Sequence, residues 1–320
     1  MSEAFAMPAK TLVEGSRSLI VPVLFVGFYV LGVFAAGYAV DHKLPKWYTL
    51  AIIATMIVLE RVYSYRYGVS QKSVLTRDVL ASFVNIYLTA AVTGLLLLPV
   101  LAFLPEYLVG RKVFFASPEQ LGPLWLQVPI ILLVVSFFRY WMHRWQHSNE
   151  FLWRLHSYHH AVTDLQGSNT YVSHPIDWAL RNALVFILLG LVGFDARAIL
   201  ITAPATAVTG IFSHCGGDVR GGILNYLLVT PEVHRWHHAA AVPEGHKYSV
   251  NYGVEFSFWD ILFGTFHLPQ KDGQAEQPAR IGHPGGMADE GNYLRLLLKP
   301  LRLWGPLPSF ASPGDHHPAE

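Results

Sequence analysis

Residues 121–147 read LGPLWLQVPIILLVVSFFRYWMHRWQH, an apolar run that passes directly into two histidines four residues apart. At a rise of about 1.5 Å per residue, the run Leu121 to Phe138 is suited to a tilted transmembrane helix, and it ends at Arg139. His143 and His147 then lie at positions i and i+4, on one face of the continued helix. The stretch therefore predicts a helix that leaves the bilayer and presents two imidazoles able to share a metal ion.

The composition supports a membrane protein. The chain is 52% hydrophobic and only 14% charged, with a mean hydropathy of +0.33, which is too apolar for an ordinary soluble domain. A net charge of +1 and the absence of a Lys/Arg-rich run exclude nucleic acid as a partner. The single cysteine, Cys215, can form neither an internal disulfide nor a thiolate metal site, so any metal must be held by nitrogen or oxygen.

Apolar segments predict an all-α, polytopic protein with about four transmembrane helices and a histidine-rich helical cap on the cytoplasmic side. A short re-entrant or tilted helical hairpin completes the membrane part. The expected spans are Leu19–Val40, Trp47–Leu59, Val79–Leu104 and Leu121–Phe138, and the expected hairpin is Asn182–Phe194 with Ala198–Ser213.

Charge in the loops sets the orientation. Four basic residues lie in the loop 61–78, whereas 105–120 carries two, so the first loop is expected in the cytoplasm. The fourth span then returns the chain to the cytoplasm before His143, which places every later histidine cluster on that side. The expected divisions are 1–122 for the N-terminal transmembrane helices, 123–268 for a catalytic region and 269–320 for a Pro/Gly-rich extension.

Sixteen histidines, eleven of them between His143 and His246, form the most informative pattern. Two HxxHH motifs, 156–160 and 234–238, follow the first pair, and each predicts imidazoles that share one helical face. Two such motifs by chance are expected well under about 1% of the time, so coincidence is a poor explanation. Thr230-Pro231 is a good helix start for the second motif. The expected ligands are His143, His147, His156, His159, His160, His234, His237 and His238.

So many histidines exceed the four ligands of one tetrahedral zinc ion, and two ions fit them better. Imidazole suits Fe, Zn, Cu and Ni alike, so the ligand type does not select the metal. Each neutral imidazole also needs a hydrogen-bond partner for its second nitrogen. The candidates for that supporting role are Asn169, Asp177, Asn251 and Asp260.

The remaining histidines are weaker candidates. His214, at the end of the expected hairpin, is placed to complete the cage, and His174 is either a ligand or the cap of a helix that begins at Pro175. His283-Pro-Gly-Gly resembles the haem-ligand motif of cytochrome b5, but a Gly-Pro turn is the better interpretation because the flanking pattern is absent. Four others are expected to be solvated and a fifth lies in a loop: His42, His267, His316 and His317, and His246.

The order HxxxH, HxxHH, lone His, HxxHH resembles the fatty acid hydroxylase superfamily, also called the sterol desaturase family. Tyr140-Trp141-Met142-His143-Arg144 is similar to the first family signature. Thr230-Pro231, Asn251-Tyr252-Gly253 and the run Trp259 to Phe266 are similar to the last, especially in the alkylglycerol monooxygenase-like branch. Many members carry an acid seven residues before the first histidine, and this chain has Ser136 there.

The resemblance implies a membrane-embedded helical core with a non-haem di-iron centre, isolated in some cases with zinc. It also implies hydroxylation of an unactivated C–H bond of a lipid with O₂ and two electrons from a separate ferredoxin, or from cytochrome b5 with its reductase. The expected location is a bacterial inner membrane or the endoplasmic reticulum. Acyl chains, sterols, ether lipids and aminolipids all remain open as substrates. A desaturase on the same scaffold is one alternative, and a metal-binding or metal-transport membrane protein is another.

Overall fold

The protein is seen in a computed structural model that describes residues 9–62, 82, 84–89, 91–95, 118–271, 273–283 and 298. Within this part of the chain the secondary structure is almost entirely helical, so the prediction of a mostly helical protein is confirmed. The elements are α1 (Ala9–Asp41), α2 (Pro45–Val62), η1 (Pro118–Leu121), α4 (Leu124–Ser148), α5 (Glu150–His156), η2 (His159–Ala161), η3 (Gly167–Asn169), α6 (Pro175–Val192), α7 (Ala196–Ser213), η4 (Gly222–Tyr226), α8 (Pro231–His237), α9 (Phe258–Leu262), and the antiparallel pair β1 (Gln270–Lys271) and β2 (Gln274–Ala275).

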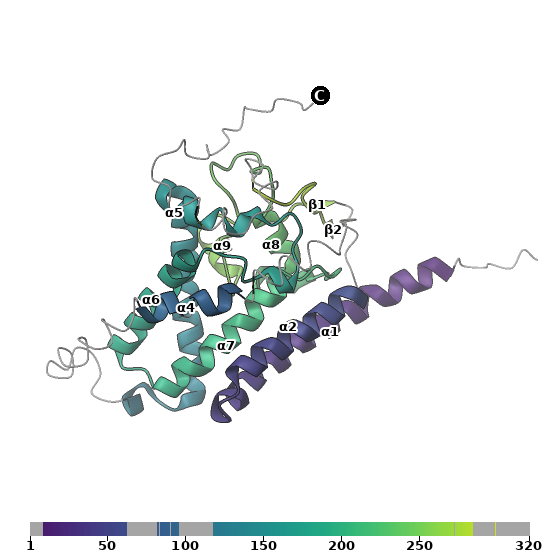
Figure 1. Cartoon of the computed structure of the whole chain (residues 1–320). Coiled ribbons are helices and arrows are strands. Elements are labelled where there is room, and N and C mark those ends of the chain that lie inside the picture. Colours follow the sequence, from purple (N-terminus) through teal and green to yellow (C-terminus); the bar gives the residue numbers. More distant parts are fainter. Residues whose placement is uncertain are drawn as a thin grey trace, which may run out of the picture.

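Helix α7 packs against helices on both of its sides. The hairpin of α1 and α2 lies along one side, and α4 and α6 lie along the other (Figure 1). Phe28 of α1, Met56 of α2 and Phe212 of α7 share one buried apolar cluster. Ile131 of α4 and Val185 of α6 belong to a second cluster that also includes the start of α7. The central position of α7 therefore fixes its C-terminal end relative to every long helix that it contacts.

Local signals explain the hairpin of α6 and α7. Pro175 is the first residue of α6, and Gly193 ends the helix with a φ of 92°, in the left-handed region where glycine is favoured. Asp195 then accepts a hydrogen bond from the backbone N–H of Arg197 and so caps α7. Because the connection is this short, α6 leads away from the histidine-rich end of the molecule and α7 returns to it.

Three described helices are long and apolar enough to cross a membrane: α4, α6 and α7. The expected stretch 182–194 overlaps most of the longer helix α6, and 198–213 makes up nearly all of α7. Asp177 and Arg181 interrupt the apolar run in sequence, but the helix continues through them, so α6 and α7 are each 18 residues long.

The first two expected spans lie within α1 and α2, and α1 contains the shorter apolar stretch Val26–Asp41. The third expected span, 79–104, lies largely outside the described residues, with an apolar helix at Val84–Leu95.

Large apolar side chains on these helices point away from the protein interior. Phe34 of α1 is 79% exposed and Trp125 of α4 is 76% exposed. Extensive apolar exposure of this kind is costly in water and is expected of surfaces that contact lipid. The apolar helices and their exposed side chains together support association with a membrane.

The cap comprises α5, η2, α8, α9 and the loops between them, and it lies at one end of the long helices (Figure 1). Side chains tie the cap to the helices below it. Glu60 of α2 accepts hydrogen bonds from the backbone N–H groups of Gly167 (2.7 Å) and Gly216 (2.8 Å). The buried guanidinium of Arg235 donates to the carbonyl oxygens of Cys215 (3.1 Å) and Gly217 (2.7 Å). These bonds fix the loops on either side of the histidines.

Candidate metal centre

Nine of the ten histidines proposed from the sequence lie together in two neighbouring groups, and all nine are buried. In each group the nearest ring nitrogens lie within 4.8 Å of one another. Ligands on opposite sides of a zinc ion would be about 4 Å apart, so the spacing is close to that of a shared ion. Group A is His143, His147, His156, His160 and His237, and group B is His159, His214, His234 and His238.

Both HxxHH motifs contribute to both groups. In each motif the first and last histidines, at i and i+4, enter one group and the middle histidine enters the other. The prediction of a single helical face is wrong for the first motif, because α5 ends at His156 and the next two histidines lie on the separate turn η2. The predicted helix start before the second motif is confirmed, because Thr230 caps α8 and Pro231 is its first residue.

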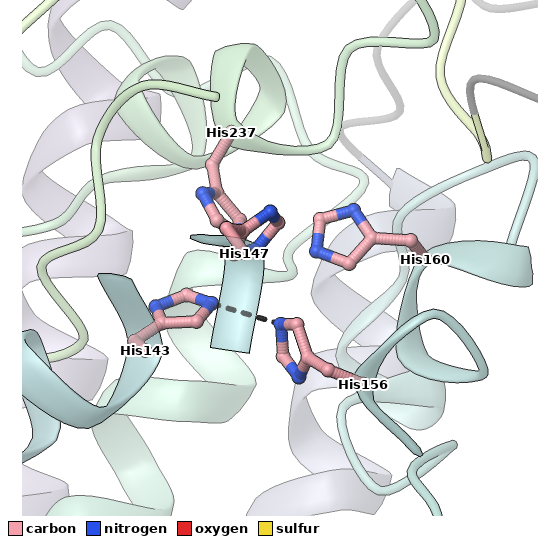
Figure 2. A group of neighbouring side chains, drawn as sticks. All are labelled: His143, His147, His156, His160 and His237. Atoms are coloured by element: carbon pink, nitrogen blue, oxygen red, sulfur yellow. Dashed lines mark hydrogen bonds between the residues drawn. The ribbon is translucent and has the colours of Figure 1, made fainter. Parts of the chain in front are cut away.

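The histidine motifs meet although they are far apart in the sequence. The rings of His160 and His238 have centroids 4.2 Å apart, and those of His143 and His237 are 4.3 Å apart. Figure 2 shows the five rings of group A converging from separate segments of the chain. The structure therefore brings the distant histidine clusters together at one place.

Hydrogen bonds orient these rings from outside the site. Three Nδ1 atoms lie close to backbone carbonyl oxygens: His143 with Tyr252 (2.8 Å), His159 with Val172 (3.0 Å) and His237 with Val250 (2.9 Å). A carbonyl oxygen only accepts, so each Nδ1 carries the proton and donates. The Nε2 atom of each of these rings is thereby left as a lone pair that can bind a metal.

The pair His143 and His156 gives the clearest indication of a cation. Nδ1 of His156 lies 3.2 Å from a carboxylate oxygen of Asp177, so this nitrogen also carries the proton. The two Nε2 atoms nevertheless lie only 3.0 Å apart (dashed line in Figure 2). Two lone pairs repel at this distance unless a positive charge lies against both, so the donor set fits a metal ion.

Further buried ring nitrogens lack a hydrogen-bond partner among the described residues. They are Nε2 of His147, His160 and His237, and both nitrogens of His234 and His238. Buried polar atoms are rarely left unsatisfied without a reason, and coordination of a metal would supply one. The same interpretation therefore applies to both groups.

Burial also keeps the rings in the form that binds metals. It lowers the pKa of His159 to about 3 and that of His237 to about 4, because the charged imidazolium is poorly solvated in the interior. Burial likewise lowers the pKa of His234 and of His238 well below the ordinary value. These imidazoles are neutral near pH 7, as metal coordination requires.

Two of the four expected supporting residues contact a histidine. Asp177 faces His156, and Oδ1 of Asn169 lies 3.2 Å from Nδ1 of His214. Asp260 supports a histidine indirectly. It accepts a hydrogen bond from the backbone N–H of Tyr252, and the carbonyl oxygen of Tyr252 orients His143.

Among the described residues, Asn251 makes no hydrogen bond to a ring of group A or group B and instead joins the backbone of Val233 to that of His267. A residue that sequence reasoning missed is Gln146, which donates to Asp177. Its position inside the HxxxH motif is the one signal that pointed to it.

The weaker candidates lie elsewhere. His174 is outside both groups and caps α6, where its Nδ1 accepts from the N–H of Ile176 (3.3 Å). His283 is buried and stacks on Trp153 with ring centroids 5.4 Å apart. Ser136 is fully buried and accepts a hydrogen bond from the indole of Trp259 (2.9 Å), so it joins α4 to α9.

His42, His246 and His267 lie outside the two groups, and His316 and His317 lie outside the described residues.

Two cavities reach the histidines from different sides. The larger, about 150 Å³, lies among α4, α6 and α7 and is bounded by His143 of group A and three histidines of group B. The smaller, about 20 Å³, lies within the cap and is bounded by three histidines of group A, with Trp153, Trp236 and His283. The larger cavity borders both groups and is the better candidate for an organic ligand.

Comparisons with known proteins agree with this geometry. Residues 128–265 match the family model described as fatty acid hydroxylase. The chain is 36% identical over 188 residues to the ornithine lipid hydroxylase OlsE of Rhizobium tropici, which covers 59% of this chain and 54% of that protein.

More distant relatives include the Delta(7)-sterol 5(6)-desaturase ERG3A of Gibberella zeae, 25% identical over 54% of this chain and 49% of the relative. Sphinganine C4-monooxygenase 1 of Arabidopsis thaliana is 26% identical over 42% of this chain and 52% of the relative. The chain thus spans about half the length of each of these three relatives. No solved structure matches the chain.

The matched region contains all nine grouped histidines. This region of the chain is therefore similar to the fatty acid hydroxylase/sterol desaturase superfamily.

Proposed function

We propose that this protein is a membrane-bound di-iron oxygenase that hydroxylates an unactivated C–H bond of a lipid with O₂ and two electrons. One observation carries the proposal: two adjoining groups of buried, neutral histidines border a cavity among apolar helices. The lipid hydroxylases and the monooxygenase among the relatives support the reaction class.

Each group would hold one ion, with five histidines around the first and four around the second. Imidazole binds iron and zinc alike, so the choice of iron rests on the family resemblance, and zinc remains possible in isolated protein. The proposed ligands are the nine grouped histidines, while His174 serves as a helix cap. Asp177 and Asn169 would hold the rings of His156 and His214 in place.

When bound, an iron pair supplies the chemistry that reduces O₂ and oxidises a C–H bond. In balanced form, R–H, O₂, two electrons and two protons give R–OH and water. The protein holds the histidines at fixed orientations through Tyr252, Val172 and Val250, and the apolar walls of the cavity exclude water from the reacting carbon.

We further propose a multi-pass arrangement in a bacterial inner membrane or the endoplasmic reticulum, with the cap in the cytoplasm. The loop charges described above support this orientation. The electrons would come from a separate ferredoxin, or from cytochrome b5 with its reductase. The divisions 1–122, 123–268 and 269–320 are retained as functional regions, and the family match at 128–265 lies within the second.

The sterol desaturase among the relatives supports a second candidate, removal of two hydrogens on the same scaffold. Product mass separates the two, because hydroxylation adds one oxygen atom and desaturation removes two hydrogen atoms. A metal transporter is less well supported, since transport ligands are expected to line a pore among spanning helices. Here the grouped histidines lie on the cap elements α5, η2 and α8 and at the C-terminal ends of α4 and α7.

The decisive test is incubation of iron-loaded protein with lipids of its host, a reductant and an electron carrier, with and without O₂. A lipid product that gains oxygen only in the presence of iron and O₂ is expected. Formation of the same product without iron or without O₂ would defeat the proposal.

A further inference from the structure

The larger cavity contains an arginine whose surroundings are unusual. Arg139 and Arg181 both line this cavity, which is bounded on one wall by small residues of α7 and at one end by histidines of both groups. One face of α7 carries only small residues at the cavity, namely Ala203, Ala207 and Gly210. Their short side chains leave room for the cavity. The cavity is therefore mainly apolar, with two guanidinium groups in its lining.

The two arginines differ in how fully they are paired. Arg139 forms an ion pair with Glu255 and also donates to the side-chain oxygen of Asn182. Arg181 makes only long contacts, 3.5 Å to Asp177 and 3.4 Å to the hydroxyl of Ser173. Its Nε atom is buried and has no hydrogen-bond partner among the described residues.

The carboxylate of Asp177 is already engaged by other donors. Gln146, His156 and Ser173 all contact it, the last at 3.2 Å. Of the side chains around Asp177, Arg181 is therefore the most distant. Most N–H groups of the Arg181 guanidinium have no acceptor among the described residues. A side chain that is only 13% exposed has little water to satisfy those donors. Such a group fits the recognition of an anionic oxygen supplied by a ligand.

The size of the cavity limits what can lie between Arg181 and the histidines. A cavity of about 150 Å³ is similar in volume to one that holds a benzene molecule, or about six heavy atoms. An acyl chain of ordinary length does not fit within it. A polar head with a few adjoining carbons does.

We infer that Arg181 binds a carboxylate or phosphate oxygen of an amphiphile that enters this cavity with its polar end first. The carbon presented to His143, His159, His214 and His234 then lies within a few bonds of the anionic group. This inference names the substrate class of the function proposed above and rests on it. Arg181 is accordingly a specificity residue, which selects anionic over uncharged amphiphiles.

Binding of simple probes tests the inference without any turnover. The probes are octanoate, octyl phosphate and octanol, titrated calorimetrically into metal-free and metal-loaded protein in a nonionic detergent. Wild-type protein should bind at least one anionic probe about 10- to 100-fold more tightly than octanol, as expected for a hydrogen bond to a charged group. The anion that binds more tightly identifies a carboxylate or a phosphate as the natural head. Equal binding of all three probes would overturn the inference.

Substitution of Arg181 locates the preference. Arg181→Gln should bind the anionic probes no better than octanol, with octanol affinity and metal content unchanged. Arg197→Gln is the matched control, because this exposed arginine of α7 pairs with Asp41, away from the cavity lining, and it should retain the preference. If Arg181→Gln binds the anions as wild type does, the inference is wrong.

A second variant protects the test against misfolding of the first. Ala207→Phe should fill the cavity and weaken binding of all three probes, while the ion pairs around Arg181 stay intact. Unchanged binding in this variant would place the probes elsewhere and overturn the inference. Loss of O₂-dependent product formation with intact anion selectivity would instead defeat only the proposed function.

Discussion

Groups A and B differ in how many histidines they contain and in how firmly those histidines are held. Group A has five, and its Nδ1 atoms at His143, His156 and His237 are fixed by a carbonyl or carboxylate oxygen. Group B has four, of which His159 and His214 have an oxygen partner at Nδ1. Neither ring nitrogen of His234 or His238 has a partner among the described residues, so these two rings of group B depend most on the metal itself for their final orientation.

The largest expected effect comes from a pair of neighbouring residues that serve different groups. His159→Ala leaves group B with three histidines, whereas His160→Ala leaves group A with four. We expect both variants to lose oxygenase activity and to remain in the membrane. Metal analysis should give about one ion per chain for His159→Ala, since three ligands hold an ion less firmly than four, and a smaller loss for His160→Ala. Full activity and full metal content in both would refute the two-group arrangement.

Acid should destabilise the metal-free protein. His159 and His237 have a pKa of about 3 and about 4 in the folded protein, but they titrate near 6.5 when unfolded. Between these values the unfolded chain binds more protons, so the free energy of unfolding falls as the pH drops below about 6.5 and is fully retained above it.

Denaturant unfolding at about pH 7.5 and about pH 5 checks the sign, which follows from the lowered pKa of both histidines. A metal-free protein that is equally or more stable at the lower pH contradicts this expectation.

Intermediate effects are expected from the residues that orient each group. Asp177→Asn beside group A and Asn169→Ala beside group B should each weaken metal binding by about 10- to 100-fold. The ring of His156 would then face a neutral amide in place of a carboxylate, and the ring of His214 would lose its partner. Competition with a chelator measures the change. Glu150→Gln, a change in an exposed residue of α5, is the control and should have no effect. Unchanged affinity in both variants would show that the metals alone orient the rings.

The smallest effect is expected at His174, outside both groups. His174→Asn should keep the cap of α6 and leave metal content unchanged, while His174→Ala should cost about 1 kcal/mol of stability. Metal analysis and thermal unfolding provide the two measurements. Loss of metal in His174→Asn would show that His174 is a metal ligand, contrary to its place outside groups A and B.

The HxxxH and HxxHH motifs named eight of the nine histidines that gather, although only the first pair and the second HxxHH motif lie on a helix as expected. The motifs did not predict which histidine belongs to which group. In each HxxHH motif the middle histidine, His159 or His237, joins the other group, and this arrangement depends on tertiary packing. Some partners of the rings, such as Tyr252, act through a backbone carbonyl oxygen, which every residue has. The sequence therefore could not predict them. Arg181 did carry a side-chain signal: it is a charge directly before the expected apolar stretch 182–194, and the helix α6 continues through it.

The hydrogen bonds of Glu60 have a practical consequence for work on fragments of this chain. This carboxylate belongs to α2, before the region that matches the family, yet it holds the backbone at Gly167 and Gly216, close to Asn169 and His214. A truncated protein that starts at α4 would leave both amides without their acceptor and strip the cover from one side of α7. Expression trials should therefore keep the N-terminal hairpin, even when the catalytic half alone is of interest.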